Sequence, residues 1–219
     1  MPALNEADGI VAALRSAREP GVGEIVVVDG GSRDDTGRLA ATVADRVLSS
    51  ARGRAAQMNA GAAGASGEVL LFLHADTRLP AGFAAAVLDA IAGGAVGGRF
   101  DVVLEGAHRF LPVVARLMNL RSRLTGISTG DQAIFVRRDV FDRLGGFAPL
   151  PLMEDVELTG RLRREGPVAA LRERVTTSGR RWEENGVART ILRMWALRLA
   201  YACGVPPERL ARAYRRARD

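Results

Sequence analysis

The chain has 219 residues, of which 47% are hydrophobic and 26% are charged. This length and balance fit one large soluble domain and exclude an intrinsically disordered chain. A net charge of +6 favours anionic partners, either substrate phosphates or an acidic membrane surface, although a solvated basic face fits the same number. Because only 5% of the residues are aromatic, we expect no nucleic-acid partner bound by base stacking.

The sequence predicts a cytoplasmic protein. A single cysteine, Cys203, rules out a disulfide framework within the chain. The first residues lack the apolar stretch of a signal peptide, and no apolar run reaches the length of about 18 residues that a membrane span needs.

The first half of the sequence alternates helical and extended patterns. We expect helices at 7–18, 54–65 and 80–91, and buried strands at 24–29 and 68–73. Alternation of this kind predicts a parallel sheet with ligands at the carboxyl ends of its strands.

The second half is less regular. We expect strands at 96–105 and 132–136, and helices at 109–123, 154–164, 187–202 and from Pro206 onward.

The chain begins with Pro2-Ala3-Leu4-Asn5-Glu6, which is typical of a loop. A parallel sheet of this kind would have a first strand that leads into such a loop. We therefore expect either that the coding start lies upstream or that the protein lacks this strand.

Two aspartates end the predicted strands. Asp29 fits a contact to a base N–H or to ribose hydroxyls, and it fits equally a turn that satisfies its own amides. Asp76 fits a ligand of Mg²⁺ or Mn²⁺ on a phosphate, because these ions take few protein ligands. A helix cap is the alternative for Asp76. His74 lies on the same strand face and is either a structural histidine or a metal ligand.

The pair Glu154-Asp155 opens a predicted helix. Acidic residues are common at this position because of the helix dipole, but a base for an attacking hydroxyl is also needed in group transfer. The segment Gly130-Asp131-Gln132 ends a loop that fits the same cleft.

Arginines provide further anion contacts. Arg54, with Arg52, precedes a helix and fits either an anion site or a solvated surface. Arg180-Arg181-Trp182 offers cations for a leaving diphosphate and a flat apolar surface for a sugar.

Together these residues resemble glycosyltransferase family 2, the inverting transferases of GT-A fold. The resemblance runs from Pro2 to about Trp182 and includes Asp29-x-Gly31-Ser32-x-Asp34-x-Thr36 and Gln57-Met58-Asn59-x-Gly61. It implies donor-binding roles for Pro2, Leu4, Asn5, Glu6, Asp29, Arg54, His74, Ala75, Asp76 and Arg181.

The family motifs also imply the catalytic groups. His74-Ala75-Asp76 falls on the Asp-x-Asp position, which makes Asp76 the metal ligand and replaces the first Asp by His74. Glu154-Asp155 matches the Glu-Asp pair, in which Asp155 is the base and Glu154 stands beside it. The acceptor side would hold Gly130, Asp131, Gln132 and Trp182.

The resemblance implies an α/β, Rossmann-like nucleotide-binding mixed sheet flanked by helices, with the first strand apparently missing. Residues 1–185 would form the catalytic domain, with a nucleotide-sugar half at 1–105 and an acceptor half at 106–185. Residues 186–219 would form a C-terminal helical tail. The motifs are similar to those of a bacterial subgroup of small, single-domain members.

The resemblance implies metal-dependent transfer of a sugar, with inversion, to the hydroxyl group of an acceptor. The expected donor is a UDP sugar, and the acceptors that fit include lipid-linked ones. A non-catalytic nucleotide-sugar-binding protein and a nucleotidyltransferase are the alternatives. Because residues 187–219 are basic and amphipathic, they fit either a peripheral membrane contact on the cytoplasmic face or packing on the catalytic domain or on a second subunit of a homodimer.

Overall fold

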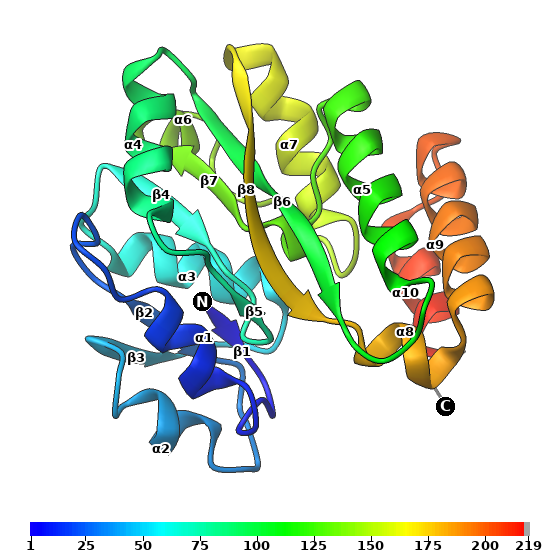
Figure 1. Ribbon diagram of the computed structural model, residues 1–219, viewed down its shortest axis with the longest axis horizontal. Coiled ribbons are helices and arrows are strands. Elements are labelled where there is room, and N and C mark those ends of the chain that lie inside the picture. Colours follow the sequence, from blue (N-terminus) through cyan, green and yellow to red (C-terminus); the bar gives the residue numbers. More distant parts are fainter. Residues whose placement is uncertain (217–219) are drawn as a thin grey trace.

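A computed structural model describes residues 1–216, with the side chains of residues 1–214. Two β-sheets are flanked by helices (Figure 1). The smaller sheet has the strand order β1-β2-β3, and the larger sheet has the order β4-β7-β6-β8-β5. This arrangement confirms a mixed α/β fold.

The smaller sheet is parallel throughout. β1 (Pro2–Ala3) pairs with β2 (Val26–Asp29), which pairs with β3 (Arg46–Ser49). The first strand that we expected to be missing is therefore present, shortened to two residues. Met1 extends its pairing, because the Met1 carbonyl accepts the Val28 N–H at 2.9 Å. A strand of two residues is too short to leave a periodic pattern in the sequence.

The larger sheet is mixed. β6 and β8 are parallel, whereas β7 is antiparallel to β4 and β6, and β5 is antiparallel to β8. The predicted parallel arrangement thus holds only for the smaller sheet. The strands are β4 (Val69–Phe72), β5 (Thr77–Arg78), β6 (Gly97–Glu105), β7 (Ile134–Arg137) and β8 (Val168–Ser178).

Helices surround the two sheets. The predicted helices at 54–65 and 187–202 are confirmed to within one residue, whereas β8 and α8 were not predicted. The helical elements are α1 (Ile10–Ser16), α2 (Thr36–Ala40), α3 (Arg54–Gly64), α4 (Phe83–Ala92), α5 (Leu111–Thr125), the 3-10 turn η1 (Gly130–Gln132), α6 (Arg138–Arg143), α7 (Glu154–Glu165), α8 (Arg180–Asn185), α9 (Val187–Ala202) and α10 (Pro207–Arg216).

The C-terminal helices pack on the segment that leads into α7. Leu197 of α9 and Leu210 of α10 form one buried cluster with Leu152 and Met153. This packing holds the predicted tail against the rest of the chain, although residues 217–219 of that tail lie outside the described residues. Within the described part, no helix is both long enough and apolar enough to cross a membrane.

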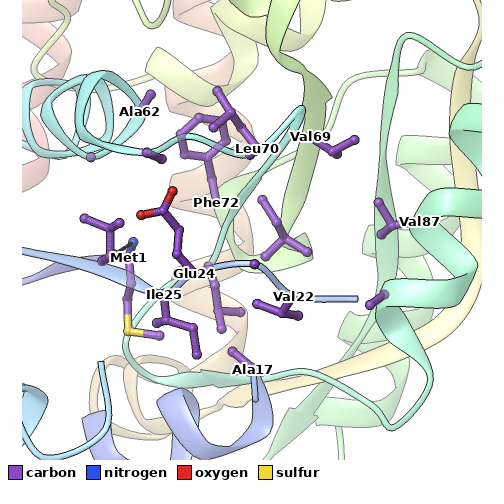
Figure 2. A pocket seen from close by; sticks show the side chains of 18 of the residues that line it. Met1, Ala17, Val22, Glu24, Ile25, Ala62, Val69, Leu70, Phe72 and Val87 are labelled. Atoms are coloured by element: carbon purple, nitrogen blue, oxygen red, sulfur yellow. Dashed lines mark hydrogen bonds between the residues drawn. The ribbon is translucent and has the colours of Figure 1, made fainter. Parts of the chain in front are cut away.

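A cavity of about 440 Å³ lies between β2 and β4, beyond the short β1. Ile25, Leu70 and Phe72 are among its apolar lining residues, and Figure 2 shows the Glu24 carboxylate among them. The predicted donor, acceptor and catalytic residues do not belong to its lining. The cavity is thus separate from the site that the sequence predicts.

Two glycines allow β6 to pass close to its neighbours. A Cβ atom at Gly98 would lie 2.4 Å from Cζ of Phe135 and 2.6 Å from the carbonyl oxygen of Ala169. A Cβ atom at Gly97 would lie 2.5 Å from the carbonyl oxygen of Phe135. These contacts explain why the confirmed strand carries glycine at both positions.

We predict that Gly98→Ala lowers the free energy of unfolding by about 1–3 kcal/mol, because the added methyl group overpacks a buried contact. Urea unfolding measures the change. Gly23→Ala is the control, since a Cβ atom there would meet nothing within 4 Å. Equal losses for the two variants would contradict the packing argument.

Candidate active site

The opening loop is bonded to the turn that follows β2. Asn5 has a positive φ of 54°, and its Oδ1 accepts the backbone N–H of Arg33 at 2.8 Å. The Asn5 N–H donates to Oγ of Ser32 at 2.9 Å, and the Glu6 N–H donates to Oγ1 of Thr36 at 2.8 Å. These bonds bring Glu6 to the edge of the smaller sheet.

Asp29 is engaged in its own turn. Its Oδ1 accepts the backbone N–H of Ser32 at 3.0 Å and the Ser32 hydroxyl at 2.6 Å. Asp29 thus stabilises its own turn, as one of the two predictions had it. It can also contact a nucleoside, because an ionised carboxylate retains acceptor capacity beyond two bonds. Pro2 lies opposite Val28 in the sheet, and Leu4 is half-buried at the start of the loop.

A buried glutamine, whose role the sequence did not reveal, supports the backbone of β1 and β2. Gln57 of α3 is 3% exposed, and its Nε2 donates to the carbonyl oxygens of Ala3 and Val28 at 2.8 and 2.9 Å. A Cβ atom at Gly30 would lie 3.0 Å from the Gln57 amide, so a larger residue there would press on this side chain. Gln57 belongs to the motif Gln57-Met58-Asn59-x-Gly61, but this motif did not reveal that the side chain supports the backbone of β1 and β2.

Asp76 and Glu6 form a pair of neighbouring carboxylates. Asp76 lies in the turn between β4 and β5, where its Oδ1 accepts the Thr77 hydroxyl at 3.2 Å. Burial raises the pKa of Glu6, and the negative charge of Asp76 raises it further, although Arg180 opposes the shift. Nη2 of Arg180 lies 3.8 Å from Oε2 of Glu6, and its charge offsets only part of the effect of burial and of Asp76 on the pKa of Glu6. The pair therefore favours a cation.

A divalent cation fits these residues if phosphate oxygens complete its coordination. Among the described side chains, no cluster of three or more His, Cys, Asp or Glu could hold a metal by itself. Mg²⁺ and Mn²⁺ do not need such a cluster, because they are commonly bound by one or two carboxylates together with substrate phosphates. Asp76 and Glu6 are the residues that would hold the ion.

His74 connects this edge to the loop that carries Asp131. Its Nδ1 lies 3.4 Å from Oδ1 of Asp131. Burial raises the pKa of Asp131, but the hydrogen bond from His74 and the nearby charges of Arg181 and Arg54 bring it well below its usual range. A Cβ atom at Gly130 would lie 2.3 Å from Nε2 of His74, so any larger residue there would have to displace the His74 ring. In this geometry His74 positions the loop.

Asp155 lies at the start of α7 and is held by the same loop. Its Oδ2 accepts the Gly130 N–H at 2.9 Å, and its Oδ1 accepts the Val156 N–H at 2.7 Å. The residue is 8% exposed. Because a carboxylate can accept about four hydrogen bonds, Asp155 keeps lone pairs for a substrate hydroxyl.

Glu154 faces Arg54 inside the protein. Its Oε1 lies 2.6 Å from Nε of Arg54, whereas its buried Oε2 has no hydrogen-bond partner among the described residues. Burial raises the pKa of Glu154 above its usual value, although the charge of Arg54 opposes this. The Glu154 side chain is 2% exposed, whereas that of its partner Arg54 is 38% exposed, so Arg54 lies between Glu154 and the solvent.

Three of the other predicted residues are placed as supports. Gln132 is fully buried, and its Nε2 donates to the Ser122 hydroxyl at 3.0 Å. Trp182 is partly buried against the apolar cluster that includes Leu111. Ala75 is buried beside Asp76. Arg181 is exposed, and its charge acts on Asp131.

Other groups at the site were missed by the sequence reasoning. Arg121 of α5 and Arg198 of α9 act electrostatically on Asp155 and Asp131, and Tyr214 of α10 acts on Arg54. In a chain with 31 basic residues, no local pattern distinguishes these two arginines from solvated ones.

The sequence model of Glycosyl transferase family 2 matches residues 1–145. The chain belongs to this family. The match covers β1 to α6 and therefore includes Glu6, Asp76 and Asp131, but it ends before Asp155. A search of curated proteins finds no match.

Solved structures of glycosyltransferases share the fold. The mannosyltransferase PcManGT from Pyrobaculum calidifontis, in complex with GDP-Man and Mn²⁺, is 26% identical with a TM-score of 0.59 over 80% of this chain and 54% of that one. The chain therefore spans about half of that enzyme. Glucosyl-3-phosphoglycerate synthase from Mycobacterium tuberculosis, in complex with Mg²⁺ and UDP, is 24% identical with a TM-score of 0.64 over 94% and 78% of the two chains.

A third similar structure is that of S. aureus TarS 1-349, at 17% identity and a TM-score of 0.58 over 81% of this chain and 59% of that one. At this identity the likeness shows the fold alone. Together with the family match, these structures confirm that the chain has the GT-A fold.

Proposed function

We propose that this glycosyltransferase moves a sugar from a nucleotide sugar to a hydroxyl acceptor with the help of a divalent cation and with inversion at the anomeric carbon. The observation that carries the proposal is one continuous connection. The Asp76–Glu6 edge continues through His74 to Asp131, and the adjoining Gly130 N–H donates to Asp155. A group that favours a cation and a group that accepts protons thus border one site.

The donor would lie along the carboxyl edge of β1, β2 and β4. Asp76 and Glu6 would hold Mg²⁺ or Mn²⁺, which when bound would withdraw negative charge from the leaving diphosphate. Arg180 and Arg181 would contact the diphosphate, and Asp29 the nucleoside. A UDP sugar is the proposed donor. GDP-mannose is the alternative, because the mannosyltransferase complex contains GDP-Man and Mn²⁺.

Asp155 would act as the base. Its free lone pair accepts the proton of the acceptor hydroxyl as that oxygen bonds to the anomeric carbon, and the bond from this carbon to the diphosphate oxygen breaks. Attack from the side opposite the leaving group inverts the carbon in one step. Glu154 would position Arg54, and Gly130, Asp131 and Gln132 would shape the acceptor side.

The remaining alternatives are weaker. Family membership favours sugar transfer over nucleotidyl transfer. A binding protein without catalysis would not need a buried carboxylate with free lone pairs next to the donor edge. We retain residues 1–105 as the donor half and 106–185 as the acceptor half, and we propose that residues 186–219 complete the acceptor side.

We predict that Asp155→Asn lowers sugar transfer by about 100-fold or more, because the amide cannot take the proton. Nucleotide-sugar binding should stay within about twofold of wild type, since Asp155 does not face the donor in this proposal. Hydrolysis or transfer of a nucleotide sugar measures the loss, with Asp142→Asn on exposed α6 as control. Near-normal transfer by Asp155→Asn would show that another group is the base.

We predict that Asp76→Asn removes the dependence of nucleotide binding on Mn²⁺, because the amide loses the negative charge that attracts the ion. Calorimetric titration of UDP and GDP with and without Mn²⁺ measures this dependence. Asp89→Asn, on the exposed surface of α4, should behave as wild type. The metal role of Asp76 is wrong if the asparagine variant responds to Mn²⁺ as strongly as wild type does.

An exposed apolar face supports the proposed membrane contact of residues 187–219. On α9, Leu192, Trp195 and Leu199 are 72%, 70% and 67% exposed. On the neighbouring α5, Leu124 is 78% exposed. Apolar side chains on a basic amphipathic helix are typical of helices that lie in a bilayer interface. The proposed location is the cytoplasmic face of a membrane, where the acceptor would be lipid-linked.

We predict that the wild-type protein floats with vesicles of anionic phospholipid and that Leu192→Ser with Trp195→Ser reduces the floated fraction by more than half. The exposed Leu88→Ser on α4 is the control. A wild-type protein that stays at the bottom of the gradient contradicts the membrane contact. If it also elutes as a dimer that the double variant disrupts, the face is a subunit interface.

A further inference from the structure

Two arginines beside Asp155 carry buried donors that have no acceptor. Nε and Nη2 of Arg121 and Nη2 of Arg198 are inaccessible to solvent, and within residues 1–214 they have no hydrogen-bond partner. Unpaired buried donors are rare in folded proteins and unfavourable for stability, above all on a charged group. Three of them at one place therefore require an explanation.

Two other arginines in the same region are held by ion pairs to Asp101. Arg99 of β6 is 1% exposed and donates to Asp101 and to the carbonyl oxygen of Phe100. Arg123, two residues after Arg121 on α5, donates to Asp101 at 2.8 Å and to the carbonyl oxygen of Ala170 at 2.9 Å. Nε of Arg99 is also buried without a partner, but the guanidinium group of Arg99 is neutralised by Asp101. Arg121 and Arg198 differ from Arg99 and Arg123 because, within residues 1–214, no ion pair holds either of them.

The two guanidinium groups share one electrostatic environment. Burial lowers the pKa of Arg121 to about 10, and the positive charge of Arg198 contributes to this shift. The carboxylates of Asp155 and Asp131 oppose it for both arginines. Neither arginine forms an ion pair with these carboxylates in the described structure. The carboxylates are instead bonded to Gly130 and His74.

The position of the pair separates it from the donor edge. Arg121 and Arg198 come from α5 and α9, on the far side of the larger sheet from β1, β2 and β3 (Figure 1). The groups that act on Glu6 at the donor edge are Asp76, Arg180 and His74. An anion bound between the two arginines would therefore reach Asp155 from the acceptor side.

We propose that Arg121 and Arg198 bind a negatively charged oxyanion, a phosphate or a carboxylate, on the acceptor molecule. This inference rests on the proposed function, because it assumes that Asp155 faces the acceptor. An oxyanion would accept the three unpaired N–H groups and would offset the repulsion between the two cations. It would also fix the acceptor hydroxyl next to Asp155, so that binding an anion and aligning the nucleophile become one event.

Anion binding to the full chain, without nucleotide or divalent cation, tests the proposal. The probes are inorganic phosphate, glycerol 3-phosphate, malonate and uncharged glycerol, titrated by calorimetry. Wild type should bind at least one anionic probe but not glycerol, and the phosphate and malonate titrations separate the two oxyanion classes. Arg121→Gln and Arg198→Gln should each weaken this binding by about tenfold or more.

Arg116→Gln on α5 and Arg189→Gln on α9 are the matched controls, because both side chains are exposed on the same two helices. They should bind the anion as wild type does. Vesicles that contain phosphatidic acid, compared with vesicles of phosphatidylcholine alone, separate a lipid phosphate from a soluble one. If the protein binds the vesicles with phosphatidic acid but not those of phosphatidylcholine, and if this binding depends on Arg121 and Arg198, the acceptor is a lipid phosphate.

Thermal unfolding excludes a merely structural role. Arg121→Gln and Arg198→Gln should keep or raise Tm, because each removes an unpaired buried charge, and phosphate should raise Tm in wild type only. The proposal is overturned if wild type binds none of the anions, or if the glutamine variants bind them as tightly as wild type. A loss of nucleotide binding alone would contradict the proposed function and not this anion site.

Discussion

The turn formed by Gly130 and Asp131 is the constraint on which the site depends. The Gly130 N–H holds Asp155 at the start of α7, and the Asp131 carboxylate pairs with His74 after β4. The His74 ring can lie against this turn because Gly130 has no side chain to displace it. This turn links the Asp76 edge, through His74, to the start of α7, where Asp155 lies.

The C-terminal helices pack next to the segment that leads to Asp155. Residues 1–145 provide the donor edge and the Gly130 turn. Asp155 and Arg198 lie beyond that region, and α9 and α10 pack directly on Leu152 and Met153 ahead of α7. In the proposed function, segments beyond the matched region complete the acceptor side, which is where acceptor selectivity would be expected to reside.

The sequence predicted the elements that have strong local patterns. The apolar run that ends at Asp76 and the acidic pair that opens α7 were recognisable because burial and helix dipoles leave a signal within a few residues. β1 was not recognisable, since two residues carry no period. The burial of Gln132 and the unpaired donors of Arg121 and Arg198 depend on contacts between distant segments, and a single sequence does not encode those as local patterns.

A crystal structure of this chain with Mn²⁺ and UDP-glucose or GDP-mannose tests the central claim most directly. We expect the diphosphate and the ion at Asp76 and Glu6, with the sugar directed toward Asp155. A nucleotide bound instead in the cavity between β2 and β4, or a diphosphate far from Asp76, would show that the proposed donor site is wrong.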